Sequence, residues 1–313
     1  MILNTGARTD IPAFYSKWFI NRIREGFVYV RNPFNPKRIT KYILDPSVID
    51  VLAFCTKNPK PMLEYIDELK KFRMFWFVTI TPYSSDLEPN VPSKKEVINS
   101  FIELSNKIGA NVLYLRYDPI IITKKYTIDY HIKCFERLCM KVYKYTSNIV
   151  ISFIDIYDKL KKNAPELKEV SYSDQALITK EFSAIAKKYN INIILCLENK
   201  NLVNLDTNIK FGCMTKEILE NALNINIIKK DKSPRGECGC VLGHDIGQYN
   251  TCMHLCRYCY ANGSKELVYK NYKNHNPLSP LLIGDVCDDD IIVDAKMESY
   301  IEKEVINLFS EDI

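Results

Sequence analysis

The chain has 313 residues and a mass of 36.4 kDa, enough for one large α/β barrel or for two ordinary domains. Apolar residues make up 47% of it, with only 10 glycines and 14 prolines, which excludes a low-complexity or disordered protein. Its 43 Lys and Arg residues against 38 Asp and Glu residues give a net charge of +5, too mild to indicate nucleic acid as a partner.

Short runs rich in Val, Ile, Phe and Tyr predict strands, and several are apolar without a break, as in strands covered on both faces. In chain order they span residues 1–4, 27–31, 51–55, 74–81, 111–117, 148–153, 191–197 and 209–212. Segments with helical spacing lie between most of them, at 13–24, 62–72, 128–145, 174–188 and 215–222. A further helix begins at the capping box of Ser93 and Glu96 and ends at Gly109.

This alternation of strands and helices matches a parallel (β/α)8 barrel of the TIM type, for which ~250 residues are typical. We therefore predict an α/β barrel over residues 1–225. A cysteine-rich segment with a C-terminal helix, residues 226–313, is expected to pack on the mouth of the barrel. A doubly wound open sheet is the alternative.

Polar residues that follow the strands are candidates for catalysis, because active sites of such barrels are built at the carboxyl ends of the strands. Carboxylates there can position a substrate or move protons. The candidates are Arg8, Asp10, Lys57, Arg116, Asp155 and Glu198.

Some of these residues also have a purely structural interpretation. Arg8 and Asp10 have the spacing of an ion pair that ties loops together, and so have Arg116 and Asp118. Lys57 precedes an Asn-Pro pair, which is typical of a solvated turn.

Cysteines give the strongest chemical signal, because five of the 11 lie in one short stretch: Cys238, Cys240, Cys252, Cys256 and Cys259. The last three are spaced Cys-x-x-x-Cys-x-x-Cys. Dense soft sulfur ligands select zinc, cuprous copper or iron–sulfur clusters. In a reducing cytosol they indicate metal or redox chemistry more often than disulfides.

Two further cysteines, Cys196 and Cys213, lie at the ends of the last two predicted strands. The cysteine-rich segment can fold back over the barrel mouth and bring Cys238 and Cys240 to them. Four thiolates would complete a closed site for a 4Fe–4S cluster or a tetrahedral zinc ion. The alternative is that Cys196 and Cys213 are small buried apolar residues. The remaining cysteines are interpreted as ordinary thiols: Cys55, Cys134, Cys139 and Cys287.

If Cys252, Cys256 and Cys259 bind a 4Fe–4S cluster, one iron keeps an open coordination position. The octet from Cys252 to Cys259, with Tyr258 before the third cysteine, resembles the signature of radical S-adenosylmethionine enzymes. Tyr260 makes it similar to the spore photoproduct lyase branch.

That resemblance implies that the open iron binds S-adenosylmethionine and that the reduced cluster cleaves it to a deoxyadenosyl radical, which the protein shields and aims. Tyr258, Tyr260 and Asn262 would be cofactor-binding residues of the loop. An electron donor such as ferredoxin or flavodoxin would be a partner, and no substrate is implied.

Two features depart from that superfamily. Its three-cysteine loop usually follows the first strand, whereas this one follows the last predicted strand. In a closed barrel the last strand lies beside the first, so the loop would still reach the same mouth. The Gly-Gly-Glu segment that contacts the methionyl amino group in those enzymes does not follow the second strand.

The chain as a whole resembles an uncharacterised family of bacterial barrel proteins, a domain of unknown function. The resemblance rests on residues 8–12, 18–22, 31–33, 56–59 and 238–262, and on Cys196, Glu198 and Cys213. It implies the barrel and the cluster but no reaction.

Other chemistries find little support. Neither a phosphate-binding Gly-x-x-x-x-Gly-Lys-Ser/Thr loop nor a Gly-x-Gly-x-x-Gly fingerprint occurs. His244 and His254 are metal ligands, hydrogen-bond donors to ligands, or plain loop histidines. Three hypotheses stay open: a radical S-adenosylmethionine-like enzyme, an iron–sulfur protein for electron transfer or Lewis acid chemistry, and a zinc-stapled binding module.

The first residues lack the basic and apolar regions of a signal peptide. The longest apolar runs are far shorter than the about 20 residues that a membrane span needs. We therefore expect a cytoplasmic protein without membrane contact.

Overall fold

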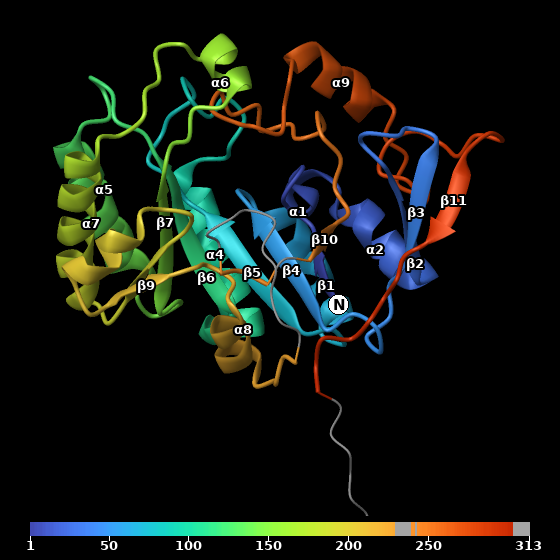
Figure 1. Cartoon of the computed structure of the whole chain (residues 1–313), viewed down its shortest axis with the longest axis horizontal. Coiled ribbons are helices and arrows are strands. Elements are labelled where there is room, and N and C mark those ends of the chain that lie inside the picture. The colour runs from blue at the N-terminus through green and yellow to red at the C-terminus, as the bar shows by residue number, and fades with distance from the viewer. Residues whose placement is uncertain (229–238, 242, 303–313) are drawn as a thin grey trace, which may run out of the picture.

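The computed structural model describes residues 1–228, 239–241 and 243–302 (Figure 1). Its main sheet has eight strands in the order β10-β1-β4-β5-β6-β7-β8-β9, and each neighbouring pair is parallel. The strands are β1 (Ile2–Asn4), β4 (Val51–Thr56), β5 (Met74–Thr79), β6 (Leu113–Ile120), β7 (Asn148–Phe153), β8 (Asn192–Leu195), β9 (Ile209–Phe211) and β10 (His244–Asp245). All six residues of β5 are buried, which explains its unbroken apolar run.

Helices follow most strands of the main sheet, as the sequence predicts. They are α1 (Ile11–Phe14), α2 (Ser16–Glu25), η1 (Lys60–Tyr65), α3 (Ile66–Leu69), α4 (Lys94–Ile108), η2 (Ala110–Val112), α5 (Ile128–Val142), α6 (Asp158–Asn163), α7 (Tyr172–Lys187), η3 (Lys200–Leu205), α8 (Lys216–Leu223) and α9 (Lys265–Lys273). The α5 and α7 helices pack through stacked rings of Phe135 and Phe182, 3.8 Å apart. No helix in the described ranges is long and apolar enough to cross a membrane.

One predicted barrel strand lies elsewhere. β2 (Phe27–Arg31) forms a separate sheet with β3 (Arg38–Ile43) and β11 (Ile291–Asp294), and it pairs antiparallel with β3. Its residues alternate between buried and half-buried, so only one face is covered. The link to β3 is too short for a parallel crossover. The prediction that residues 27–31 belong to the barrel is therefore wrong, and β10 completes the main sheet instead.

The residues just before β10 form hydrogen bonds with the residues just after β9, so the two edge strands of the main sheet are in contact there. Cys240 forms an antiparallel bridge with Thr215, which follows β9. The Val241 N–H donates to the Met214 carbonyl at 2.8 Å. We call this contact between the two edges of the sheet the seam.

On the other side of the seam, β10 lies against β1. A Cβ at Gly243 would lie 2.2 Å from the Ile2 carbonyl oxygen, so only glycine permits this approach. β11 likewise pairs with β3, so residues after 226 contribute a strand to each sheet. The domain boundary at residue 225 stays a prediction.

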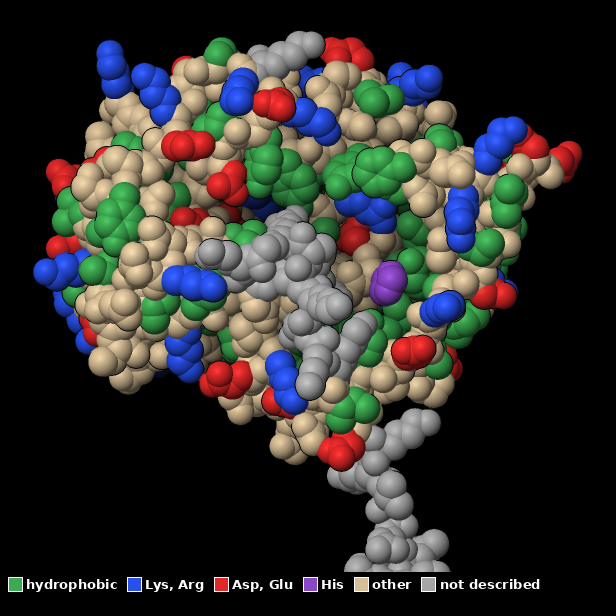
Figure 2. Space-filling view, viewed as in Figure 1, with side chains coloured by type: hydrophobic (Ala, Val, Ile, Leu, Met, Phe, Trp, Pro, Cys, Tyr) green, Lys and Arg blue, Asp and Glu red, His purple; other side chains and the backbone are tan. Residues whose placement is uncertain are grey.

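Charged side chains of both signs are interspersed over the face shown in Figure 2, in keeping with the small net charge.

Candidate metal centre

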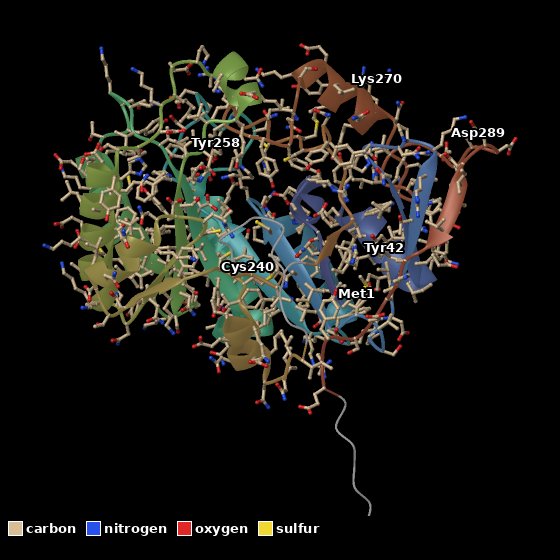
Figure 3. All side chains as sticks on the ribbon, in the orientation of Figure 1. Met1, Tyr42, Cys240, Tyr258, Lys270 and Asp289 are labelled. Carbon is tan, nitrogen blue, oxygen red and sulfur yellow. The ribbon has the colours of Figure 1, made fainter. Side chains whose placement is uncertain are left out.

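Residues 252–259, the three-cysteine loop, follow β10 and dock on the segment after β5. The Arg257 N–H donates to the Leu87 carbonyl at 3.0 Å, and the Asn90 side-chain amide donates to the Met253 carbonyl at 2.7 Å. The loop therefore lies at the carboxyl ends of the parallel strands, as predicted. Figure 3 shows Tyr258 at that end, away from Met1 at the start of β1.

The Asp10 carboxylate ties the loop to the segment after β1. It accepts hydrogen bonds from the backbone N–H of Ala13 at 3.0 Å and of Lys57 at 2.8 Å. Its Oδ2 lies 2.9 Å from His254 Nε2, and both side chains are buried. Asp10 therefore positions the three-cysteine loop, and His254 is its partner there.

Arg8 does not pair with Asp10, so that structural interpretation is wrong. Its Nε donates instead to Asp245 of β10 at 2.8 Å. The Ala7 N–H also donates to Asp245, at 2.8 Å, and the Tyr260 hydroxyl donates to the Ala7 carbonyl. Arg8 and Tyr260 thus join the end of β1 to β10 and to the loop.

Glu88, which the sequence did not single out, is the centre of a buried hydrogen-bond network. It accepts from Lys57 Nζ at 2.8 Å, from the Thr81 hydroxyl at 2.6 Å, and from Lys94 and the Tyr258 hydroxyl. Burial raises the pKa of Glu88, but the charges of Lys57 and Lys94 lower it by more, and the net pKa is about 2. Glu88 is therefore a carboxylate at neutral pH.

Lys57 is a half-buried ammonium group beside the cysteines. Burial lowers its pKa, but Glu88 and then Cys256 raise it by more, so the net pKa lies above the ordinary value. Its Nζ lies 5.5 Å from the centre of the Tyr258 ring. The interpretation of Lys57 as a solvated turn residue is wrong, since its side chain is only 15% exposed.

The thiols of the loop lie close enough to influence one another. Burial is the largest cause that raises the pKa of Cys252 far above its ordinary value, that of Cys256 to about 12, and that of Cys259. The charge of Cys259 raises the pKa of the other two further. Without a cation these thiols keep their protons, and a bound metal would displace them.

A backbone N–H group points at one of the sulfur atoms. The Ala261 N–H donates to Cys259 Sγ at 3.3 Å. Leu255 adopts a left-handed φ of 54°, which costs roughly 1–2 kcal/mol for a residue with a side chain. Such strain persists where the surroundings hold a functional geometry in place.

Asn262 has an unsatisfied oxygen next to the loop. Its Nδ2 donates to the Cys252 carbonyl at 2.8 Å, which fixes the orientation of the amide. Its Oδ1 is buried and has no hydrogen-bond partner in the described part of the chain. A buried acceptor without a donor costs about 1–3 kcal/mol, so this oxygen suits an N–H group of a ligand.

Cys196, Cys213 and Cys240 come together at the seam, as predicted, and we call them the seam cysteines. Cys196 Sγ lies 3.4 Å from Cys213 Sγ, which lies 3.7 Å from Cys240 Sγ. Cys238, the fourth predicted ligand, lies outside the described residues. Among the residues that are described, no three His, Cys, Asp or Glu side chains are arranged to hold a metal ion as they stand.

Arg116 and Asp118 form the ion pair expected from their spacing, with Arg116 Nε 2.8 Å from Asp118 Oδ2. Burial has the largest effect on the pKa of Lys57 and lowers it. The hydrogen bond with Cys213 has the largest effect on the pKa of Cys196 and raises it. The Asp118 charge raises both pKa values in addition. The Asp118 charge therefore acts on both Lys57 and Cys196.

Glu198 and Asp155 are at the same mouth. Glu198 Oε1 accepts from the Phe153 N–H at 2.7 Å. Burial, followed by the charges of Asp155, Asp118 and Cys196, raises the pKa of Glu198 to about 8. Asp155 is exposed and accepts from the Tyr157 hydroxyl at 3.1 Å.

Comparison with known proteins gives one family. The model of that family, described as "Domain of unknown function (DUF1848)", matches residues 2–261, which include the main sheet and the three-cysteine loop. No curated protein matches the chain.

Proposed function

The chain belongs to the DUF1848 family, and we propose that it is an iron–sulfur enzyme of the radical S-adenosylmethionine-like type, acting at the carboxyl ends of its strands. The observation that carries this proposal is the three-cysteine loop: half-buried neighbouring thiols, an N–H group directed at sulfur, and a half-buried lysine beside them. We further propose that the main sheet closes at the seam into a (β/α)8 barrel.

The residues of the loop fit a 4Fe–4S cluster. Such a cluster binds each cysteine at a different iron, so the thiols need not meet around one ion. Three cysteines leave one iron open, and N–H···S hydrogen bonds tune the cluster. Lys57 would offset part of the negative charge of the thiolates. When bound, the cluster would supply the electron that cleaves S-adenosylmethionine.

Asn262 offers a substitute for the missing Gly-Gly-Glu segment. In radical enzymes that segment contacts the methionyl amino group, which is a hydrogen-bond donor. The unsatisfied Asn262 Oδ1 would accept from that group, at a position anchored to Cys252. Tyr258 belongs to the same loop and its hydroxyl donates to Glu88.

The strand order supports the resemblance as well. In radical S-adenosylmethionine enzymes the three-cysteine loop usually follows the first strand. Here it follows β10, which is an edge strand and lies next to β1. In the spatial order of the sheet β10 is the first strand, so the loop follows the first strand in space although it comes late in the chain.

The predicted catalytic residues would divide into three groups. Arg8, Asp10 and Lys57 hold the loop in place through the contacts described above. Glu198 and the exposed Asp155 have carboxyl groups at the mouth and are the side chains proposed to contact the substrate. Arg116 is bound to Asp118 and to the seam cysteines.

The test is anaerobic reconstitution with iron and sulfide. We expect about four iron and four sulfide per chain at the three-cysteine loop, and deoxyadenosine on reduction with S-adenosylmethionine. Cys256→Ala should abolish this cluster because it removes one of three ligands. Cys240→Ala should leave it intact, and Cys134→Ala, which replaces a cysteine of α5, is the matched control.

Each outcome bears on the proposal. Equal iron loss in Cys256→Ala and Cys240→Ala would contradict a separate cluster on the loop. A cluster without deoxyadenosine would favour electron transfer or Lewis acid chemistry. A colourless protein that takes up no iron would reject all iron–sulfur functions.

A further inference from the structure

We propose that the seam cysteines, Cys196, Cys213 and Cys240, form a second and separate site that binds one zinc ion or a similar soft divalent cation. The site would join the two edges of the main sheet. It goes beyond the proposed function, because it involves none of the ligands of the iron–sulfur cluster.

Two of the three sulfur separations are close to those around a single ion. Two thiolates on one tetrahedral zinc ion, with Zn–S bonds of about 2.3 Å, lie about 3.8 Å apart. The observed distances are 3.4 Å between Cys196 and Cys213 and 3.7 Å between Cys213 and Cys240. A disulfide would need about 2.05 Å. An iron–sulfur cluster would place the cysteines on different irons, further apart.

Binding requires the side chains to move. As they stand, the side chains do not meet the geometry of a metal site in the described residues. The contact between Cys196 and Cys213 must open by about 0.4 Å to reach the zinc-bound separation. Cys196 is half-buried at the end of β8, which leaves its side chain room for that movement.

Each sulfur already has an N–H donor. Arg116 Nη2 lies 3.4 Å from Cys196 Sγ, and its Nη1 lies 3.6 Å from Cys213 Sγ. The Met214 N–H donates to Cys240 Sγ at 3.3 Å. Asp118 holds the Arg116 side chain. Donors of this kind favour thiolates and orient metal ligands from outside the coordination sphere.

The charges also balance. Three thiolates carry a charge of −3, and a divalent ion with the Arg116 guanidinium carries +3. Cys213 and Cys240 are only 7% and 3% exposed, so uncompensated charge there would be costly. A bound divalent cation would displace the thiol protons, and together with Arg116 it would neutralise the three thiolates.

The position of the ligands gives the site a role. Cys196 follows β8, Cys213 follows β9, and Cys240 bridges to Thr215 shortly before the chain enters β10. Because β10 pairs with β1, an ion at these cysteines would hold the β9 edge of the main sheet to the β10 edge. Figure 3 shows Cys240 in the middle of the molecule, apart from Tyr258 on the three-cysteine loop.

The experiment is a Co²⁺ titration of the Cys256→Ala protein, whose iron–sulfur site is disabled. We expect one Co²⁺ per chain, with near-ultraviolet thiolate-to-cobalt bands and the visible bands of tetrahedral cobalt, and displacement by Zn²⁺. Adding Cys213→Ala or Cys240→Ala should abolish these bands, while adding Cys134→Ala should preserve them. Arg116→Gln, which removes an outer donor, should weaken binding about 10- to 100-fold.

Thiol protection gives a second readout that needs no variant. Zn²⁺ should protect Cys196, Cys213 and Cys240 from alkylation, measured by mass spectrometry, and should leave the exposed Cys287 reactive. Absence of thiolate bands, or protection that is equal with and without Zn²⁺, would overturn the proposal. Because the titration uses Cys256→Ala, its failure would leave the iron–sulfur proposal intact.

Discussion

The buried His131 of α5 has a different partner at each ring nitrogen. Nε2 lies 3.0 Å from the Ile121 carbonyl and Nδ1 lies 2.9 Å from the Tyr117 hydroxyl. A carbonyl can only accept, so Nε2 carries the proton and Nδ1 accepts from Tyr117. Burial lowers the pKa of His131 to about 4, which keeps the ring neutral at physiological pH.

Acid should therefore destabilise the protein through His131. In the unfolded chain the histidine pKa is about 6.5, so the unfolded state takes up the proton first as the pH falls. The stabilisation is complete above about pH 6.5 and is lost towards pH 4, by up to about 3 kcal/mol at 1.36 kcal/mol per pKa unit. Urea unfolding of the wild type and of His131→Gln at pH 7 and pH 4.5 measures the free energy of unfolding that each protein loses on acidification. The variant should lose less stability on acidification, and an equal loss would refute the assignment.

At this scale the cysteines were predictable and their surroundings were not. Spacing alone indicated the three-cysteine loop, and strand ends placed Cys196 near Cys213. Glu88 carried no signal, because it is one acidic residue in a polar loop. Its burial depends on lysines and a tyrosine from distant parts of the chain, which no local pattern reveals.

Among the elements, α4 begins as the sequence predicts. The Glu96 N–H donates to Ser93 Oγ at 3.3 Å, and the Ser93 N–H donates to Glu96 Oε2 at 3.1 Å. This capping box satisfies two backbone donors that the helix itself leaves without partners.

Ser93→Ala should remove one of these hydrogen bonds and lower the free energy of unfolding by about 1 kcal/mol. Ser93→Asp should retain most of the stability, since aspartate also accepts at this position. Chemical denaturation of the three proteins tests this. If alanine and aspartate cost the same, the cap would not be the cause.

Short or amphipathic elements escaped prediction. β10 has two residues, too few for any periodicity, and its place in the sheet depends on pairing with β1. β2 has the alternation of a one-sided strand, but its position in the chain order suggested a barrel strand. Only the antiparallel partner β3 reveals its sheet.

Across the whole molecule, the order of the other seven strands of the main sheet follows the chain and was predictable from the alternation of elements. The pairing of β10 with β1 was not, because it joins residues more than two hundred positions apart, Leu3 with His244 and Asn4 with Asp245. Its integrity depends on a close backbone contact at Gly243.

Gly243→Ala should disturb the pairing of β10 with β1. The new Cβ would lie 2.2 Å from the Ile2 carbonyl, so the backbone of β10 must shift. We expect a loss of about 1–3 kcal/mol in unfolding free energy, and weaker iron binding because the three-cysteine loop follows β10. Gly239→Ala is the matched control, since its Cβ would meet only Thr215 Cγ2 at 3.9 Å. Equal stability and iron content in both variants would show that the contact is unimportant.

The pairing of β10 with β1 also sets the order of events during protein synthesis. Ribosomes add about 5–20 residues per second, so β1 waits tens of seconds for the strand that will cover its outer edge. The strands β4 to β9 leave the ribosome in the meantime, and the three-cysteine loop emerges after them. Its thiols therefore emerge after those strands, and the proposed cluster would be inserted into a nearly finished protein.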